Sequence, residues 1–463
     1  MKTKDLLKVL GISFLVVVLL SWIIPAGIYS SGKFTSLGQT VPIGLYDIFR
    51  TPLLSLATFI QYGLLLLVIG GFYGVLNKTQ VYSKLINNIV KKWNKKKNIF
   101  LIITIVLFAL LTSLMGTLNL VFVLVPFFTA ILLKLGYSKI TAFASTVGSM
   151  LFGQIGCILG FDIWGYLTYF FDVNMTTMLA ARIILFIIIT VLLVLLINKK
   201  SKDDSKENEI PLYEENTSKK GVIPLIIISI LTFVFLFIGL YNWESAFGID
   251  IFTSLDETIM SSEIGGYPFL SNLLGTVSVI GSFNNYDLMC VLIISSLIIG
   301  WIYSVRVKDM LIGFKDGAKQ MLLPALYALL SCTIFASVLN MSSGNFVITI
   351  IDKFISGSEK FSLLGTIGSG LVSSFAYNDF YYVLYNLYCV FSLYDASTIP
   401  IIALIFQTMY GIVMVIAPTS IFLLAGLSYL DIPYKEWAKY IWKFLLIILA
   451  VVVIVLFILT TLI

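Results

Sequence analysis

One stretch of the sequence decides the fold, and residues 98–136 of it read NIFLIITIVLFALLTSLMGTLNLVFVLVPFFTAILLKLG. The stretch is long enough to enter a bilayer, because a spanning helix needs about 20 apolar residues. Lys97 precedes it, and Lys134 and Lys139 lie at its end. Because basic residues collect on the cytoplasmic side of a membrane, both ends belong to that side. The polar residues at 113–119 therefore predict the tip of a re-entrant hairpin.

A second stretch, 361–394, has the same character, but both of its ends fall on the outer side. An interrupted apolar helix follows each hairpin. The first covers 139–173 and is weakened at 153–157, and the second covers 397–428 and is broken at 418–420. Non-helical backbone at membrane depth is tolerated only where it is buried in protein or lines a water-filled cavity.

Seven other apolar runs can cross the bilayer as single helices. They are 9–28, 55–76, 180–198, 222–242, 285–304, 321–340 and 444–463. The N-terminus is placed in the cytoplasm, because most of the 30 Lys and Arg residues then lie inside. The prediction is an all-α polytopic membrane protein with about nine transmembrane helices, two re-entrant hairpins and an external C-terminus.

A shift of 260 residues aligns the two halves of the chain. Asn119 then meets Asp379, and the weak point 153–158 meets 413–418. By the charges, the first unit begins outside and the second begins inside, which predicts two inverted repeats. In transporters built this way, the substrate and ion sites lie near the midplane, where discontinuous helices meet.

The predicted organisation divides the chain into five parts. They are 1–54 (first span and outer loop), 55–198 (first repeat with hairpin 98–136), 199–220 (a polar, flexible cytoplasmic linker), 221–319 (connecting spans) and 320–463 (second repeat with hairpin 361–394). The regions 32–54, 243–283 and 341–360 are expected to be surface loops with short amphipathic helices.

The composition of the 463-residue chain supports this prediction, with 59% hydrophobic residues, 12% charged residues and a mean hydropathy of +1.01. This composition excludes a soluble enzyme, whose entire surface would be in contact with water. The net charge of +6 is modest, so nucleic-acid binding is not expected. Histidine is absent and the four cysteines lie in apolar segments, so neither a zinc site nor a disulfide framework is expected. No nucleotide-binding motif occurs, and no cofactor beyond a coupling Na⁺ is predicted.

The hairpin tips supply the predicted site. Helix N-termini favour anions, and C-termini and unwound carbonyls favour cations. The predicted substrate-binding residues are Ser113, Thr117, Asn119, Gln154, Asn378, Thr419 and Ser420, and the predicted coupling-ion residues are Asp379, Ser373, Ser374 and Pro418. For each hydroxyl an alternative stays open, because Ser and Thr in membrane helices also bond their own i−4 carbonyl.

Asp379 stands apart, because an ionisable side chain deep in a bilayer is costly unless it is paired or hydrated. No Lys or Arg lies beside it in the same apolar stretch. Three roles remain open: a proton carrier, a Na⁺ ligand, or the partner of a cationic solute. The alternative is a shallow tip, at which the carboxylate is simply in contact with water.

Several short strings, taken in order, resemble the YfcC-like, C4-dicarboxylate anaerobic carrier family of the ion transporter superfamily. They are 22–27 (WIIPAG), 42–49 (PIGLYDIF), 70–74 (GGFYG), 313–319 (GFKDGAK), 418–420 (PTS) and 432–437 (IPYKEW). The resemblance covers nearly the whole chain. It implies two inverted repeats with two hairpins, elevator-type alternating access and a homodimer. It also implies transport of dicarboxylates, other carboxylates or, by exchange, basic amino acids.

The chain departs from the family pattern at the expected site. Asn119 and Leu120 follow Gly116 where the family has an acidic pair. Residues 376–380 read AYNDF where the family has a Ser-Gly-Ser-Gly-Gln tip, and Met414 stands where an Asn is expected. The resemblance therefore implies the scaffold but not the identity of the substrate.

Together these features predict an elevator-type secondary active transporter of the cell membrane. Its solute is a small polar organic molecule, a carboxylate or an amino acid, driven by Na⁺ or H⁺ or by exchange. The alternatives are a basic amino-acid (arginine/ornithine-like) antiporter and, from another class, an ion channel. An enzyme is disfavoured, because no histidine, paired carboxylate or metal-ligand cluster is recognisable in the sequence. The expected partners are the solute, the lipid bilayer and a second copy of the chain.

Overall fold

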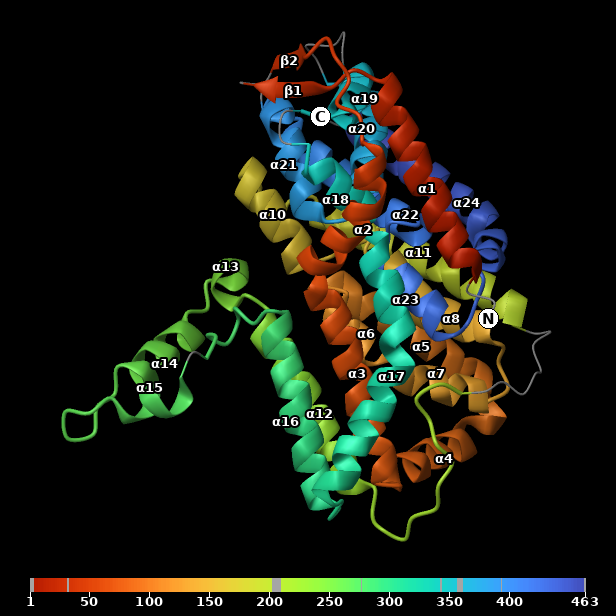
Figure 1. Ribbon diagram of the computed structural model, residues 1–463, viewed down its shortest axis with the longest axis vertical. Helices are drawn as coiled ribbons and strands as arrows, with labels where there is room; N and C mark the ends of the chain where they lie inside the picture. The colour runs from red at the N-terminus through yellow and green to blue at the C-terminus, as the bar shows by residue number, and fades with distance from the viewer. Residues whose placement is uncertain are drawn as a thin grey trace. The chain divides into compact units, whose positions relative to one another are not determined.

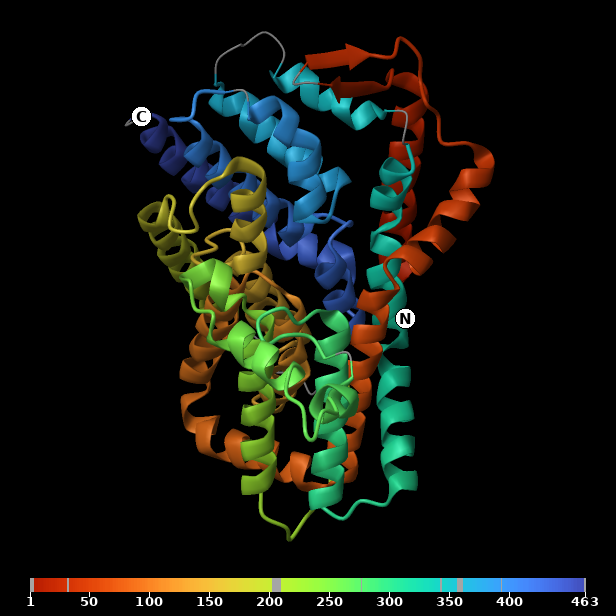
Figure 2. The same cartoon turned by 90° about the vertical axis from the view of Figure 1, so that its left-hand side faces the viewer.

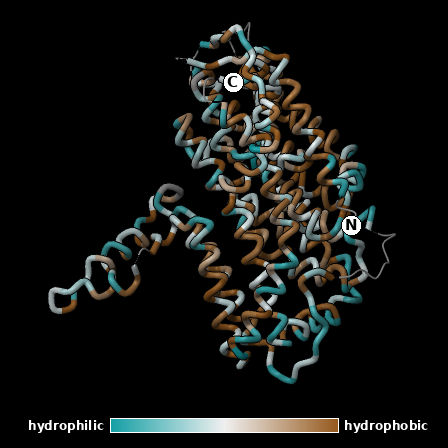
Figure 3. Tube along the Cα trace, viewed as in Figure 1, coloured by the Kyte–Doolittle hydropathy of each residue, from teal (hydrophilic) through white to brown (hydrophobic). Residues whose placement is uncertain are grey.

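The computed structural model describes residues 4–30, 33–201, 210–275, 277–341, 344–355, 361–392 and 394–461. Within these ranges the named strands are β1 (Gly27–Ser30) and β2 (Lys33–Ser36), which pair antiparallel, and the other named elements are helical. Nine helices of the described residues are long and apolar enough to cross a membrane. Figure 3 shows the apolar colour along most helices and the polar colour mainly at loops and helix ends. The prediction of an all-α polytopic membrane protein is confirmed.

The chain forms two compact units. Unit 1 comprises 1–64, 89–211 and 321–463, and unit 2 comprises 65–88 and 212–320. The helices of unit 1 are α1 (Lys4–Ile23), α2 (Leu45–Thr58), α5 (Lys97–Met115), α6 (Asn119–Val123), α7 (Val125–Lys134), α8 (Lys139–Phe143), α9 (Ser149–Gly153), α10 (Phe161–Phe171), α11 (Leu179–Lys200), α18 (Thr333–Leu339), α19 (Phe346–Ile355), α20 (Leu363–Ala376), α21 (Phe380–Phe391), α22 (Ile399–Ile416), α23 (Ile421–Tyr429) and α24 (Tyr434–Thr460). Those of unit 2 are α12 (Ile223–Leu240), α13 (Trp243–Phe247), α14 (Ile251–Met260), α15 (Phe269–Leu274) and α16 (Asn285–Ile302), while α3 (Ile60–Lys78), α4 (Val81–Trp93) and α17 (Val307–Ser331) have residues in both.

Both predicted hairpins are present in unit 1 (Figure 1). In the first, α5 ends at Met115 and the chain reverses before α6 and α7. Gly116 makes this reversal at φ +77°, a left-handed conformation that glycine adopts without the steric cost of a Cβ. In the second hairpin, α20 ends at Ala376 and α21 begins at Phe380.

The two interrupted helices are broken where the sequence predicted. A π-helical turn (Ala144–Gly148) joins α8 to α9, which ends at Gly153, and α10 begins only at Phe161. In the second broken helix, α22 ends at Ile416 and α23 begins at Ile421, with Pro418 between them. Proline stops a helix here because it has no N–H to donate and its ring clashes with the preceding turn.

The same order of elements therefore occurs twice: a helical hairpin, a broken helix and a long helix. It reads α5–α7, α8–α10 and α11 in the first half, and α20–α21, α22–α23 and α24 in the second. The broken helices pack on each other through α9 and α22. Gln407 Nε2 donates to the Ile155 carbonyl oxygen at 2.7 Å, and a Cβ on Gly411 would lie 2.8 Å from the Ile155 backbone.

One of the three predicted loop regions differs in part from the expectation of short amphipathic helices, because it also contains a strand. In the 32–54 region the chain first completes the β1–β2 ribbon, which lies beside α19 (Figures 1 and 2). Thr349 Oγ1 donates to the Pro25 carbonyl oxygen at 2.8 Å and fastens α19 to the start of the ribbon.

Helix α17 begins at Val307, although hydropathy placed a span only from residue 321. Hydropathy detects the part of a helix that lies in hydrocarbon, and a polar continuation of the same helix leaves no such signal.

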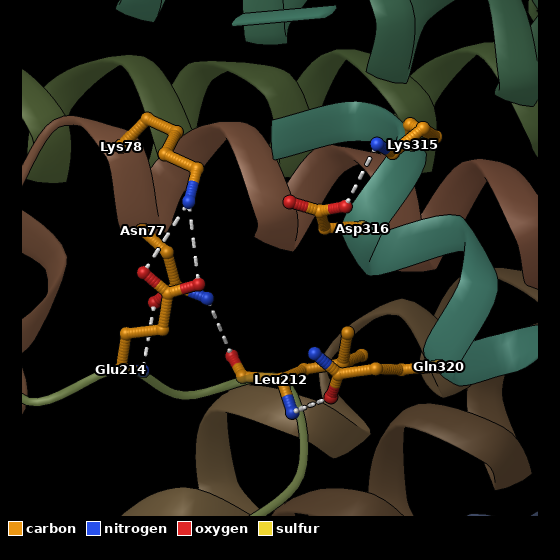
Figure 4. Close-up of polar contacts among 7 residues, drawn as sticks. All are labelled: Asn77, Lys78, Leu212, Glu214, Lys315, Asp316 and Gln320. Carbon is orange, nitrogen blue, oxygen red and sulfur yellow. Dashed lines mark hydrogen bonds and ion pairs between the residues drawn. The ribbon is translucent and has the colours of Figure 1, made fainter. Parts of the chain in front are cut away.

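The 199–220 linker was predicted to be flexible, and 202–209 of it lie outside the described residues. The remainder in unit 2, from Leu212 onwards, is held against helix ends (Figure 4). Asn77 Nδ2 donates to the Leu212 carbonyl oxygen (3.1 Å), and the Glu214 amide donates to Asn77 Oδ1 (3.3 Å). The Leu212 amide donates to Gln320 Oε1 (2.8 Å), and Lys78 pairs with Glu214 (3.4 Å). Side chains of the neighbouring helices, Asn77 and Gln320, thus bind the backbone of this part of the linker.

Unit 2 also explains two of the family-like strings. The strings 70–74 and 313–319 lie on α3 and α17, which touch backbone to backbone. A Cβ on Gly74 would lie 2.0 Å from the Gly313 carbonyl oxygen, and a Cβ on Gly317 would lie 2.0 Å from that of Gly70. Small residues spaced by four let membrane helices approach this closely. These glycines are therefore required by packing.

Candidate functional site

A cavity of about 140 Å³ lies in unit 1 where the two hairpin tips meet the two helix breaks. We call it the inner cavity. Its walls come from α3, the first hairpin, the first break with α10, the second hairpin, and α22 with α23. The lining residues are Tyr62, Gly116, Thr117, Leu118, Asn119, Gln154, Asp162, Ile163, Tyr166, Asn378, Asp379, Phe380, Tyr410, Met414, Ser420, Ile421 and Phe422.

Helix ends of both polarities surround the inner cavity. The N-terminal ends are those of α6, α10, α21 and α23, and the C-terminal ends are those of α5, α9, α20 and α22. Each end carries roughly half an elementary charge, positive at an N-terminus and negative at a C-terminus. Four ends of each sign approximately cancel, so ionisable side chains decide the charge of the cavity.

Those side chains are two carboxylates, Asp162 and Asp379. Asp162 lies in the first turn of α10 and lines the cavity together with Thr117. Asp379 is the N-cap of α21 and accepts a hydrogen bond from the Tyr381 amide at 2.9 Å. The two carboxylates are near enough to interact electrostatically. Among the described residues that line the cavity none is Lys or Arg, so the cavity is negatively charged whenever both acids are ionised.

Aromatic rings form much of the remaining wall. The Phe380 and Tyr410 ring centroids are 5.1 Å apart, and those of Tyr62 and Phe422 are 6.4 Å apart. The Tyr410 hydroxyl donates to the Asn378 carbonyl oxygen at 3.1 Å. Gln154 is buried, and its Oε1 has no hydrogen-bond partner in the described part of the chain. The cavity thus offers carboxylates, an amide oxygen and aromatic faces, a set that suits a cation or a cationic group.

Polar groups of each hairpin hold the neighbouring helix break. The Ser113 hydroxyl donates to the Gly156 carbonyl oxygen (2.6 Å) and accepts from the Ile158 amide (2.9 Å). In the second repeat, Asn378 Nδ2 donates to the Thr419 carbonyl oxygen at 2.7 Å. These contacts satisfy backbone groups that a broken helix would otherwise bury without partners.

The structure brings six of the predicted site residues to the inner cavity. They are Thr117, Asn119, Gln154, Asn378, Asp379 and Ser420. Ser113 is not among the described lining residues and instead forms a hydrogen bond with the first break. Pro418 lies within the second break. Ser373 bonds the Gly370 carbonyl oxygen of its own helix (3.2 Å). The buried hydroxyls of Ser374 and Thr419 have no partner among the described residues.

Sequence reasoning did not select Asp162. The signal was present, because Asp162 is the single acidic residue between Lys139 and Phe171 and lies in an apolar stretch, as Asp379 does. The argument from the cost of a membrane-buried carboxylate applies equally to both. Tyr62, Tyr166 and Tyr410 gave no such signal, because tyrosines are common at packing and interface positions throughout this chain.

Comparisons with known proteins found a matching family and similar solved structures. A sequence model of a family described as C4-dicarboxylate anaerobic carrier matches residues 4–376. The structure is similar to that of the Alcanivorax borkumensis YdaH transporter, at 12% identity and a TM-score of 0.43, covering 98% of this chain and 97% of that one. It is also similar to Neisseria gonorrhoeae MtrF, described with a class of antimetabolite efflux pumps, at 12% identity and a TM-score of 0.41, covering 96% and 94%. Among proteins of curated function none matches.

Proposed function

The chain belongs to the C4-dicarboxylate anaerobic carrier family, and we propose that it works as an elevator in which Asp162 and Asp379 jointly hold the coupling cation. Its family and its apolar helices make it a multi-pass membrane protein that transports a small organic solute. The proposal adds the mechanism, the ion, Na⁺ or H⁺, and the residues that bind it.

One observation carries this proposal: two carboxylates share a small cavity, and no basic side chain is among its described lining residues. Carboxylates that share a site repel each other, and a bound cation or proton removes this repulsion. An uncompensated charge is also costly to move through a bilayer. The cation-loaded cavity would therefore cross more easily than a cavity with both acids ionised, so its movement depends on the bound cation.

The mobile part of the proposed elevator consists of both hairpins with 139–173 and 397–428, sliding against the other spans. Two contacts support the view that the broken helices move together. Gln407 donates to the Ile155 carbonyl oxygen, and Gly411 allows the two backbones to touch. Because packed interiors resist deformation, such a pair is expected to move as one body.

The class of solute follows from the same charges. A dicarboxylate would be repelled by Asp162 and Asp379 unless coupling cations entered with it, so carboxylate transport requires cation symport. A basic amino acid could pair with the acids directly, and its transport would then be exchange without a separate cation. The aromatic wall formed by Tyr166, Tyr410 and Phe380 favours this second candidate, because aromatic faces attract ammonium and guanidinium groups.

Ligand-dependent stability separates these possibilities, because a ligand that binds the folded state raises the melting temperature by mass action. Purified protein is titrated with Na⁺, protons, dicarboxylates and basic amino acids. The double variant Asp162→Asn/Asp379→Asn should lose stabilisation by the cation, whereas Asp395→Asn, an exposed acid of unit 1, should retain it. The paired cation site is refuted if two results occur together. Na⁺ would stabilise the double variant as strongly as the wild type, and neither protons nor basic amino acids would stabilise the wild type.

Orientation and assembly complete the proposal: a homodimer in the cell membrane with a cytoplasmic N-terminus and an external C-terminus. Cysteines introduced at 243–265 should then be labelled from outside, and cysteines at 200–218 only from inside. Reversed labelling would place the N-terminus outside and contradict the charge argument.

A further inference from the structure

A second pocket lies in unit 1 at the far ends of α10 and α21. Its volume is about 470 Å³, and five of its seven lining residues are aromatic. We call it the outer aromatic pocket, and it is lined by Tyr29, Tyr169, Phe170, Ile348, Tyr385, Asn386 and Tyr388. The pocket is open, since Tyr169 is 76% exposed and Tyr385 is 58% exposed.

Helices α10 and α21 connect this pocket to the inner cavity. They pack side by side, and the contacts of Tyr166 with Tyr381 and of Phe171 with Tyr388 show that they run parallel (Figure 1). Each helix begins at the inner cavity with its acid, Asp162 or Asp379. Each helix then continues to the outer aromatic pocket, so both pockets lie along one seam.

Ring contacts are continuous along this seam. Tyr166 lines the inner cavity, and its ring centroid is 5.5 Å from that of Tyr381. Tyr381 in turn stacks on Tyr385 at 6.2 Å and contacts Phe170 at 5.2 Å. Tyr385 and Phe170 belong to the outer aromatic pocket. The Tyr166–Tyr381 contact therefore joins a ring that lines the inner cavity to a ring that contacts the outer aromatic pocket.

The chemistry of the outer aromatic pocket favours a cation. An ammonium or guanidinium group over the face of an aromatic ring gains a factor of roughly two to five in affinity per ring at an exposed site. No Lys or Arg is among the described residues that line the pocket. An acid, Asp352, lies beside the pocket and accepts a hydrogen bond from the Tyr29 hydroxyl at 3.4 Å.

We propose that the outer aromatic pocket binds an organic cation, an ammonium or guanidinium compound, and that the Tyr166–Tyr381 contact is a closed gate between this pocket and the inner cavity. The inference rests on the proposed function in one respect, namely that the inner cavity is the transport site. Tyrosines also gather at membrane interfaces to anchor helices. An anchoring role predicts no preference for charge in the pocket and no effect of Tyr381 on access to the cavity.

Binding is tested with choline and its uncharged carbon isostere, 3,3-dimethylbutan-1-ol. The background is Asp162→Asn/Asp379→Asn, in which the inner cavity no longer attracts a cation. The protein is placed in nanodiscs of phosphatidylglycerol, whose head group has no ammonium group and so cannot occupy the pocket as a lipid. Choline should bind at least fivefold more tightly than the isostere, as measured by calorimetry or saturation-transfer NMR.

Paired substitutions then assign the site. Tyr385→Leu/Tyr388→Leu keeps apolar bulk but removes two rings, and it should weaken choline binding by about four- to twenty-fivefold. The matched variant Tyr385→Phe/Tyr388→Phe keeps both rings and should stay within about twofold of the parent. Equal binding of choline and the isostere, or no loss in the Leu variant, would overturn the binding site.

The gate is tested by chemical access to Ser420→Cys in an otherwise cysteine-free chain, because Ser420 lines the inner cavity. A cationic methanethiosulfonate should modify this cysteine at least tenfold faster when Tyr381 is replaced by Ala, and at the original rate with Tyr381→Phe. An unchanged rate in Tyr381→Ala would overturn the gate.

Failure here is distinguishable from failure of the proposed function. The choline measurement is made with the inner acids already neutralised, so it does not depend on a coupling cation at that site. Conversely, stabilisation by a coupling cation reports on Asp162 and Asp379 and is measured without choline. It should therefore persist even if the outer aromatic pocket binds no cation.

Discussion

The two repeats share a scaffold but distribute their chemistry differently. In the first repeat the acid, Asp162, is on the broken helix, and the hairpin tip carries Asn119. In the second repeat the acid, Asp379, is at the hairpin tip, and the broken helix contributes Ser420. One cavity thus receives one carboxylate from each repeat, from opposite kinds of element.

The breaks are also held differently. Ser113 secures the first break with two hydrogen bonds of its hydroxyl, whereas the hydroxyl of the aligned Ser373 bonds, within the described part of the chain, a carbonyl of its own helix. The second break has Pro418 and the hydrogen bond from Asn378 to the Thr419 carbonyl oxygen. The comparison teaches that a repeated fold fixes where polar groups meet, while each repeat solves the local hydrogen bonding with its own residues.

The largest effect is expected from removing both acids. Asp162→Asn/Asp379→Asn should lower cation-driven uptake in proteoliposomes by about 100-fold or more, since coupling then lacks both charges. The single variant Asp379→Asn mimics a protonated acid, so if Asp379 carries the coupling proton, net accumulation should vanish while solute exchange persists. Loss of exchange as well would assign Asp379 to a cationic solute. Unchanged net uptake in both variants would remove the acids from the site.

Moving the charge between repeats sharpens the comparison. Asn119→Asp combined with Asp379→Asn keeps two carboxylates in the inner cavity but takes both from the first repeat. Cation stabilisation should recover partly, to within about tenfold of the wild-type affinity, because both tips line the same cavity. The reference is Asp379→Asn alone, measured by thermal titration. Affinity no better than that reference would mean that the acid must cap α21.

Pro418→Ala tests whether the second break is needed for transport. Without the proline, α22 can continue through Thr419, which removes the bent carbonyls. Uptake should fall by about tenfold while membrane insertion stays normal. Pro400→Ala is the matched control, because Pro400 lies in the first turn of α22, where proline is tolerated. Wild-type uptake in Pro418→Ala would reduce the break to a simple kink.

The smallest effect concerns the two aligned serines. Ser113→Ala should lower the free energy of unfolding by about 2–3 kcal/mol, because a buried carbonyl and a partly buried amide lose their partner. Ser373→Ala should cost less than about 1 kcal/mol, because Ser373 bonds only a carbonyl of its own helix. Both are measured by denaturation in mixed micelles. Equal costs would show that the hydroxyl of Ser113 is not what holds the first break.

Much of the fold was predictable from the sequence. Hydropathy and the positions of Lys and Arg located both hairpins and both breaks, because the bilayer penalises every polar group that it contacts. Hydropathy and charge did not predict the structure of segments outside the bilayer, because no hydrocarbon constrains their polar groups. The defined conformations of residues 210–220 and of the β1–β2 ribbon depend on hydrogen bonds to distant residues, such as Asn77 and Asn345.

The candidate site was only half predictable. The tips were identified, and Asp379 was selected, because a carboxylate in an apolar stretch is conspicuous. Asp162 carries the same signal but lies in a helix where no tip was expected, and the sequence does not say that α10 begins beside the second hairpin. The tyrosines of the cavity were not distinguishable in the sequence from those that pack elsewhere.

The sequence by itself therefore determined which segments enter the membrane and where their helices stop, because these depend on local hydropathy, charge and backbone chemistry. Only the tertiary structure decided which interruptions share a cavity and which hydroxyls face it. Ser113 and Thr117 are four residues apart on one tip, yet Ser113 binds the break at Gly156 and Thr117 lines the inner cavity. These different roles of the two hydroxyls result from packing between residues that are distant along the chain. Periodicity within one segment does not predict such packing.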